Sequence, residues 1–284
     1  MPTLDGKTCI ITGATSGIGL ATAERLAPLG ARLLLVGRDP AKGEAARARL
    51  RALAPSAEVA FFYADLATLG GVRRLATELL AAAPRIDVLL NNAGAIFNAR
   101  RETADGLERT FALNHMAYFL LSRLLLERIV ASAPARIVNV ASAAHLGAQL
   151  DLDDLQTKRD YSGWKAYRRS KLCNILFTRA LACRLAGTGV TANALHPGFV
   201  ASRFGDNNAG LFRLGFSFAK RVAAISAEKG AETPAYLAAS PEVEGETGLY
   251  FAKCRPATPS AAAQDDAAAE RLWQESARLA GIPA

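Results

Sequence analysis

Two side chains that can handle a proton lie four residues apart in the segment YRRSK, which runs from Tyr167 to Lys171. On a helix, residues at this spacing share one face. A phenol has a pKa of about 10 in water and is a poor base at pH 7, but a neighbouring ammonium group favours the phenolate. We therefore predict that Tyr167 transfers a proton during a reaction and that Lys171 lowers its pKa.

Two further polar residues can join this pair. Ser142 ends the apolar run RIVNVAS, so its hydroxyl can bind and orient a substrate oxygen. Asn114, in the segment FALNH, would hold a water molecule that links Lys171 to solvent. Taken singly, such residues are more often a strand-end cap and a polar group inside a helix. Together with Tyr167 and Lys171, they predict a catalytic group of four.

A glycine-rich segment, TGATSGIG, follows the first apolar run and opens the first expected helix. Glycine permits a tight turn and a close approach of the backbone to a ligand, and a helix N-terminus offers free N–H groups to a phosphate. A dinucleotide binds in this strand-to-helix context, and a turn without a ligand is the alternative. The predicted contacts are Gly13, Thr15, Ser16, Gly17, Ile18 and Gly19.

The second apolar run, in RLLLVGRDP, places Arg38 where NAD-binding sheets carry an acidic residue for the ribose 2′-hydroxyl. A guanidinium suits a 2′-phosphate, and Lys42 would assist it. Asp39 follows, but it precedes Pro40 and could instead cap the next helix. A solvated surface role for Arg38 is the alternative. The pattern favours NADP(H) over NAD(H).

Other predicted cofactor contacts follow later strands of the expected sheet. Ligands bind at the carboxyl ends of the strands in open α/β sheets, although any one of these residues could simply form a turn or a cap. We expect Tyr167 and Lys171 to contact the cofactor too, Lys171 through the nicotinamide ribose hydroxyls. The remaining contacts are Asp65 and Leu66 beside the adenine, Asn92, Ala93 and Gly94, and Pro197, Gly198 and Val200 beside the nicotinamide.

The elements that must position these residues alternate between short apolar runs and helical patterns. Runs that are apolar on both faces and joined by helices form a parallel sheet covered on two sides. The sequence therefore predicts a doubly wound, Rossmann-type α/β fold with a parallel sheet of seven strands. We expect one domain over residues 1–284, with a cofactor half to about 135 and a catalytic and substrate half from about 136. One long helix is expected before Ser132.

The composition excludes several classes of function. The formal charge of +8 could indicate nucleic-acid binding, but the arginines are scattered and form no basic stripe or tail. The four cysteines show no CxxC spacing, which predicts reduced thiols and no metal site. No apolar run approaches the roughly 20 residues that span a bilayer, and the N-terminus predicts no signal peptide. We expect a cytoplasmic protein that binds no nucleic acid.

The chain resembles the short-chain dehydrogenase/reductase family in TGATSGIG, NNAG, YRRSK and HPG, together with Asn114 and Ser142. More narrowly, it is similar to the retinol dehydrogenases that reduce retinaldehyde with NADPH in LLLERIVASAPARIVNVAS, SKLCNILFTRALACRLAGTGVTANALHPG and LYFAKC. This resemblance implies that Tyr167 donates the proton, that Lys171 controls the cofactor and the pKa, that Ser142 orients the substrate and that Asn114 serves a proton relay.

The chain departs from the family at two positions. Ala141 stands where many relatives have a second serine, and Ser202 stands where many have threonine. Neither departure removes the chemistry. The retinol enzymes also carry a membrane-anchoring N-terminus, and because we expect none here, their lipid-associated role is not carried over.

A segment within about 203–226, RFGDNNAGLFRLGFSFAKRV, places phenylalanine and leucine between glycines. It predicts a mobile apolar lid that selects a bulky hydrophobic carbonyl or alcohol substrate. The same segment could instead fill the core, form a contact in a homo-oligomer or, with Arg213, Lys220 and Arg221, rest on a membrane surface. The weaker alternative for the whole chain is a non-catalytic NADP(H)-binding sensor or scaffold, which would often lack the tyrosine or the lysine.

Overall fold

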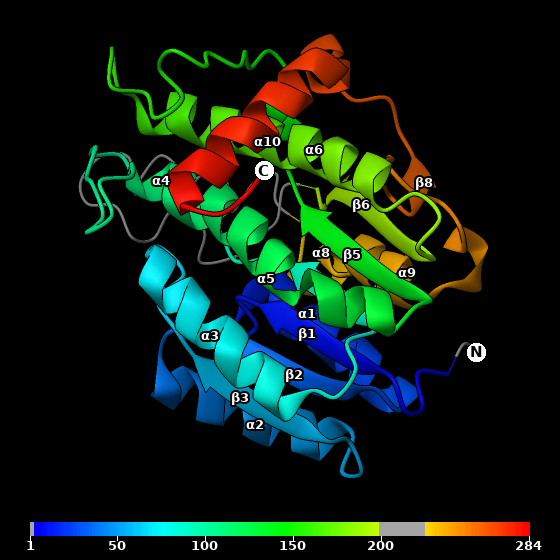
Figure 1. The fold of residues 1–284 in the computed structure, drawn as a ribbon. Coiled ribbons are helices and arrows are strands. Elements are labelled where there is room, and N and C mark those ends of the chain that lie inside the picture. Colours follow the sequence, from blue (N-terminus) through cyan, green and yellow to red (C-terminus); the bar gives the residue numbers. More distant parts are fainter. Residues whose placement is uncertain (1–2, 199–224) are drawn as a thin grey trace.

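The sheet has eight strands in the order β3-β2-β1-β4-β5-β6-β7-β8 in the computed structural model, which describes residues 3–198 and 225–284 (Figure 1). This is the predicted doubly wound α/β fold, and the count of seven strands was one short. The eighth strand is a two-residue antiparallel addition after a turn at Lys253 and Cys254, both with positive φ. The strands are β1 (Thr8–Thr12), β2 (Arg32–Gly37), β3 (Val59–Tyr63), β4 (Val88–Asn91), β5 (Ala135–Val140), β6 (Val190–His196), β7 (Tyr250–Ala252) and β8 (Arg255–Pro256).

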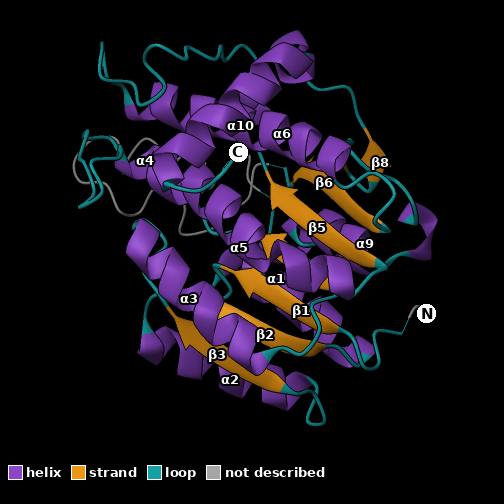
Figure 2. Ribbon diagram, viewed as in Figure 1, coloured by secondary structure: helices purple, strands orange, loops and turns teal. Residues whose placement is uncertain are grey.

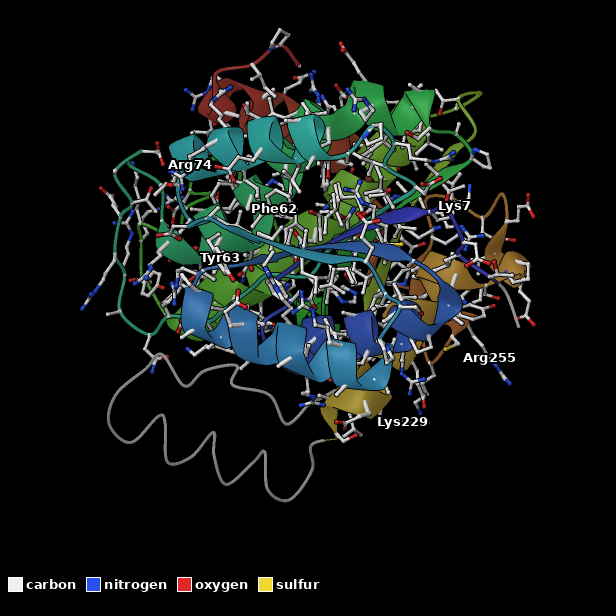
Figure 3. The ribbon with its side chains drawn as sticks, turned by 90° about the horizontal axis from the view of Figure 1, so that it is seen from below. Lys7, Phe62, Tyr63, Arg74, Lys229 and Arg255 are labelled. Carbon is white, nitrogen blue, oxygen red and sulfur yellow. The ribbon has the colours of Figure 1, made fainter. Side chains whose placement is uncertain are left out.

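Helices cover both faces of the sheet (Figure 2). Seen from below, β3 and β2 lie between α3 on one side and α2 on the other, with Phe62 and Tyr63 on β3 between these layers (Figure 3). The helices are α1 (Gly17–Leu26), α2 (Pro40–Leu53), α3 (Leu69–Ala82), α4 (Arg109–Phe111), α5 (Ala117–Ala131), α6 (Gly163–Arg184), α8 (Ala227–Gly230), α9 (Glu232–Ala239) and α10 (Asp266–Ala280). Short 3-10 turns occupy Ala27–Leu29, Ala143–His145, Pro241–Val243 and Ala261–Gln264.

The alternation of side chains along each strand produces two hydrophobic cores. Ile10 and Leu34 point into the core under α3, α5, α6 and α10, whereas Ile11 and Leu35 point into the core under α1, α2 and α9. All four side chains are essentially buried, as expected for strands that are apolar on both faces. The sheet therefore has no solvated face in its centre, and functional side chains gather at the ends of its strands.

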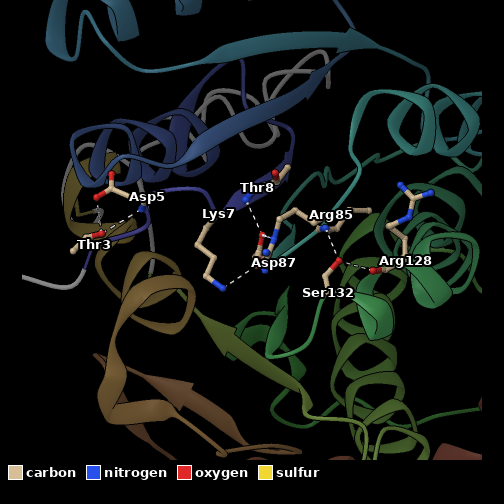
Figure 4. Close-up of polar contacts among 9 residues, drawn as sticks. Thr3, Asp5, Lys7, Thr8, Arg85, Asp87, Arg128 and Ser132 are labelled. Carbon is tan, nitrogen blue, oxygen red and sulfur yellow. Dashed lines mark hydrogen bonds and ion pairs between the residues drawn. The ribbon is translucent and has the colours of Figure 1, made fainter.

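A buried carboxylate joins β1 to β4 at the amino ends of these strands (Figure 4). Asp87 accepts hydrogen bonds from the backbone N–H of Thr8 at 2.9 Å, from Lys7 Nζ at 3.0 Å and from Arg85 Nε at 2.9 Å. Burial alone would raise the pKa of Asp87, but these partners lower it below its usual value. The network fixes the register of the strands that carry the glycine-rich loop and the NNAG turn.

The single long helix expected before Ser132 is interrupted. A π-helical segment, Ala112–Met116, separates α4 from α5. Such bulges are frequent at functional sites, and this one contains Asn114. Helical periodicity continues through the bulge, so the sequence pattern could not show it.

His115, in the same segment, is fully buried, and its Nε2 lies 2.8 Å from Ser276 Oγ on α10. Burial lowers its pKa to about 3. Above pH 6.5 the ring is neutral in both the folded and the unfolded chain. Between pH 6.5 and about 3 only the unfolded chain binds the proton, so the free energy of unfolding falls as the pH decreases, by up to about 1.4 kcal/mol per pH unit.

We predict that His115→Gln, which does not titrate, loses less stability than the parent between pH 7.5 and pH 5. The expected difference in the pH-dependent loss is about 2 kcal/mol, measured by urea unfolding at the two pH values. The other two histidines titrate in both proteins, so their contribution cancels. An identical pH dependence in the two proteins would contradict the buried neutral imidazole.

Candidate active site

A cavity of about 500 Å³ opens where the strand order reverses, between β1 and β4, at the carboxyl ends of the strands. Open α/β sheets bind ligands at this point. Two predicted residues within the described part of the chain, Gly19 and Asn114, are not among those that line it. The predicted residues that line it are Gly13, Thr15, Ser16, Gly17, Ile18, Arg38, Asp65, Leu66, Asn92, Ala93, Gly94, Ser142, Tyr167, Lys171, Pro197 and Gly198.

The glycine-rich loop is built by close backbone contacts. Gly13 has a φ of +68°, and a Cβ there would lie 2.9 Å from the Cα of Ala93. A Cβ on Gly19 would lie 2.5 Å from the carbonyl oxygen of Gly13 and 2.6 Å from Nδ2 of Asn92. Gly19 therefore shapes the loop from behind and does not face the cavity. Ser16, the N-cap of α1, makes no side-chain cap hydrogen bond, so the first N–H groups of α1 remain available to an anion.

The two charged residues that follow β2, Asp39 and Arg38, have different surroundings. The Asp39 carboxylate caps α2 by accepting from the N–H groups of Ala41 and Lys42, and it pairs with Lys42 Nζ at 3.1 Å. These interactions with Lys42 lower the pKa of Asp39. Arg38 lines the cavity, is exposed and has no ion-pair partner within residues 3–198 and 225–284. Lys42 also lines the cavity, with its ammonium paired to Asp39, and its help to Arg38 stays a prediction.

The NNAG turn is fixed to the end of β1. Thr12 Oγ1 accepts from the N–H of Asn92 at 2.9 Å and from the N–H of Ala93 at 3.0 Å, while Nδ2 of Asn92 donates to the Thr12 carbonyl at 2.8 Å. Asn91, by contrast, points into the protein and donates to Asn139 Oδ1 at 2.8 Å. One asparagine of the pair therefore shapes the cavity and the other ties the sheet together.

Tyr167 and Lys171 lie together on α6 as predicted, both almost completely buried. Lys171 Nζ donates to the Val140 carbonyl at 2.8 Å and lies 5.8 Å from the Tyr167 ring centroid. Burial raises the pKa of Tyr167 to about 12, with a hydrogen bond from Ser142 acting in the opposite direction. Burial also lowers the pKa of Lys171 to about 7. We expected Lys171 to lower the tyrosine pKa, but desolvation by the protein outweighs such an effect.

Ser142 is held from both sides. Its hydroxyl accepts from the N–H of Ala144 at 3.1 Å, and its carbonyl accepts from Nδ1 of His145 at 2.7 Å. Nε2 of His145 in turn accepts from the N–H of Ser260 at 3.1 Å. Both nitrogens of His145 are therefore occupied, and this histidine positions the serine and is not a free acid or base.

Asn114 acts on the site through its neighbours. Its amide exchanges two hydrogen bonds of 2.9 Å with the backbone of Ala95 and donates to Ser170 Oγ at 3.0 Å. The side chain thus joins the NNAG turn to α6. A Cβ on Gly94 would lie 3.2 Å from Asn114 Oδ1 and 3.5 Å from Lys171 Nζ, which places the amide beside the lysine. The water relay assigned to Asn114 stays a prediction.

The sequence reasoning missed several apolar residues that line the cavity, and the three largest of them are Phe97, Leu113 and Trp164. Trp164 precedes Tyr167 by one helical turn, and this spacing could have identified it. Phe97 and Leu113 carry no comparable signal, because the loop after β4 and the π-helical segment have no regular pattern. Val200 and residues 203–224 of the predicted lid lie outside the described residues.

The comparisons with known proteins agree with this geometry. A family model described as short chain dehydrogenase matches residues 7–209. Mouse retinol dehydrogenase 12 is 42% identical over 98% of this chain and 88% of its own length. The structure of an uncharacterized protein from Mycobacterium paratuberculosis is 33% identical, with a TM-score of 0.80 over 99% of this chain and 96% of that one. A short chain dehydrogenase from Burkholderia cenocepacia in complex with NADP is 26% identical, with a TM-score of 0.69 over 87% and 96%.

The chain belongs to the short-chain dehydrogenase family, and within it to the retinol dehydrogenase-like group. It is an oxidoreductase of the class that acts on CH–OH groups with a nicotinamide dinucleotide. The cradle formed by Gly13, Gly19 and the open end of α1 fits the pyrophosphate of such a cofactor. Among the described residues, no helix is both long enough and apolar enough to cross a membrane.

Gly19→Ala should weaken dinucleotide binding although the residue does not line the cavity. The added methyl group would push on Gly13 and Asn92, and overpacking of this kind costs about 1 to 3 kcal/mol. We expect the affinity for NADPH to fall at least about fivefold, measured by fluorescence titration. Gly70→Ala on α3 is the matched control, because nothing lies within 4 Å of its added Cβ. Equal affinities in the two variants would refute the role of Gly19.

Proposed function

We propose that this protein is an NADP(H)-dependent oxidoreductase that interconverts a bulky, apolar aldehyde or ketone and its alcohol. One observation carries the proposal: a buried phenol, Tyr167, lies beside Ser142 and Lys171 at the catalytic end of a cavity built for a dinucleotide. Retinol dehydrogenases among the relatives support an alcohol or carbonyl substrate, and Arg38 supports the 2′-phosphate of NADP(H).

The bound cofactor would supply the hydride, and the protein must supply the proton and the geometry. With a pKa of about 12, Tyr167 keeps its proton at neutral pH and acts as the acid that protonates the carbonyl oxygen. The Ser142 hydroxyl orients that oxygen and stabilises the phenolate that forms at Tyr167 Oη. Lys171 Nζ lies next to the ring. Because the pKa of Lys171 is about 7, a large fraction of its side chains carries the charged ammonium group at neutral pH.

The choice of NADP(H) rests on the end of β2. Asp39, the only carboxylate next to Arg38 in the sequence, is occupied by its cap on α2 and by Lys42. It is therefore poorly placed to accept a bond from a ribose 2′-hydroxyl, as an NAD-binding site would require. The exposed guanidinium of Arg38 at the rim of the cavity can bind a phosphate with two parallel hydrogen bonds.

Tyr167→Phe is expected to lower turnover by at least about 100-fold, because general acid catalysis contributes at least that factor. The dissociation constant for NADPH should remain within about threefold of the parent value, measured by fluorescence titration. Tyr250→Phe is the matched control, since the buried Tyr250 hydroxyl has no hydrogen-bond partner in the described part of the chain. Unchanged turnover in Tyr167→Phe would rule out the mechanism. NADPH binding by the parent without turnover of any carbonyl would favour a sensor.

Arg38→Asp is expected to reduce the preference for NADPH over NADH. The variant replaces a phosphate-binding cation by an anion that repels the 2′-phosphate, so the ratio of kcat/KM for the two cofactors should fall at least about tenfold. Arg51→Asp makes the same charge change at the other end of α2 and should leave the ratio unchanged. A ratio that is the same in Arg38→Asp and the parent would show that another group binds the phosphate.

A further inference from the structure

An exposed tryptophan lies next to the proposed acid. Trp164 keeps 46% of its surface exposed. It is one of three exposed large apolar side chains among residues 3–198 and 225–284. Its ring is stacked against that of Tyr167, with centroids 5.8 Å apart and planes inclined by 26°. Single exposed apolar side chains are common on protein surfaces, but this indole lines the cavity beside the proposed acid, where a ligand would contact it.

The backbone holds Trp164 in this place. It lies in the first turn of α6, whose N-cap, Ser162, accepts a hydrogen bond from the N–H of Lys165. The preceding residue, Gly163, is packed so closely on Phe97 that an added Cβ would collide with the Phe97 carbonyl oxygen. This contact brings the loop after β4 and the start of α6 together, so that the Phe97 and Trp164 side chains line the same cavity.

The other residue of this apolar wall is Leu113, which precedes Asn114 in the π-helical segment. We define the wall as Phe97, Leu113 and Trp164. The Phe97 ring is backed by the guanidinium of Arg109, 4.3 Å from its centroid, and is 8% exposed. Phe97 is thus a fixed surface, whereas the indole of Trp164 stacks on the Tyr167 ring and keeps 46% of its surface exposed.

Trp164 also borders a second hollow, of about 690 Å³, whose lining is mostly polar or charged and includes Asp151, Arg168 and Arg271. The indole therefore stands between the catalytic cavity and this neighbouring groove. A substrate whose carbonyl lies at Tyr167 and whose body is longer than the cavity would pass along the indole before it reached the polar groove. A short aldehyde would reach Tyr167 without touching most of the indole.

We propose that Trp164 is a specificity-determining residue: the extended apolar chain of a long carbonyl substrate packs on its indole, which positions the carbonyl carbon for reduction. This inference rests on the proposed function and deepens it by naming the substrate class, a carbonyl at the end of a long apolar chain. It assigns the selection of chain length to the described wall and requires no contribution from residues 199–224.

Kinetics with a short and a long aldehyde test the proposal. With NADPH, Trp164→Ala should lower kcat/KM for decanal at least tenfold, mainly through KM, and leave propanal within about twofold. Trp164→Phe, which keeps an aromatic surface, should retain most of the decanal activity. Leu53→Ala removes another exposed apolar side chain, on α2, and should change neither substrate. Equal losses for both aldehydes, carried by kcat, would overturn the proposal and show that Trp164 merely supports Tyr167.

A binding experiment gives a second readout that needs no turnover. The chain has two tryptophans, and the other, Trp273, is 2% exposed. Decanal added to the complex with NADP⁺, a pair between which no hydride can pass, should shift the tryptophan emission to shorter wavelength as the indole of Trp164 leaves water. Trp164→Phe, which retains only Trp273, should show no shift, and neither should propanal with the parent protein.

The two failures can be told apart. If none of the carbonyl compounds tested causes the parent protein to oxidise NADPH, the proposed function is wrong. The emission shift still decides whether a long apolar chain binds at Trp164. If the parent reduces decanal but its emission does not shift, and Trp164→Ala retains the preference of the parent for decanal over propanal, the function stands and the role of Trp164 is refuted.

Discussion

The joint between the ends of β1 and β4 supports the rest of the site. Thr12 accepts from the N–H groups of Asn92 and Ala93 at 2.9 and 3.0 Å, so the glycine-rich loop and the NNAG turn cannot move apart. Two residues further on, Ala95 is bound by the amide of Asn114, which also reaches α6. These hydrogen bonds, together with the backbone from Asn92 to Ala95, link the end of β1 to α6, the helix that carries the proposed acid Tyr167. The side chains of Thr12 and Asn114 act here by holding the backbone in place.

Burial is the second constraint, and it sets the chemistry of the pair on α6. The same low-dielectric surroundings raise the pKa of Tyr167 to about 12 and lower that of Lys171 to about 7. A phenol that keeps its proton is suited to give it to a carbonyl oxygen, so the protein by itself favours the acid role. The positive charge of an oxidised nicotinamide, when present, would favour the phenolate needed for the reverse direction.

The substrate side of the cavity is built differently from the cofactor side. The cradle is made of backbone and glycines, where a single methyl group would collide. The apolar wall is made of side chains from three separate elements, brought together by the close packing of Gly163 on Phe97. Side chains of this kind can change without disturbing the sheet. The arrangement lets one scaffold keep its cofactor while its substrate varies.

The sequence by itself determined the doubly wound fold, the glycine-rich cradle and the Tyr167–Lys171 pair, because strand alternation, helical spacing and local turn chemistry act over a few residues. The tertiary structure decided what depends on distant residues. It placed Gly19 behind the loop and broke the long helix at Asn114. It also set the direction of the tyrosine pKa shift, since desolvation depends on every group packed around a side chain and not on its neighbours in the chain.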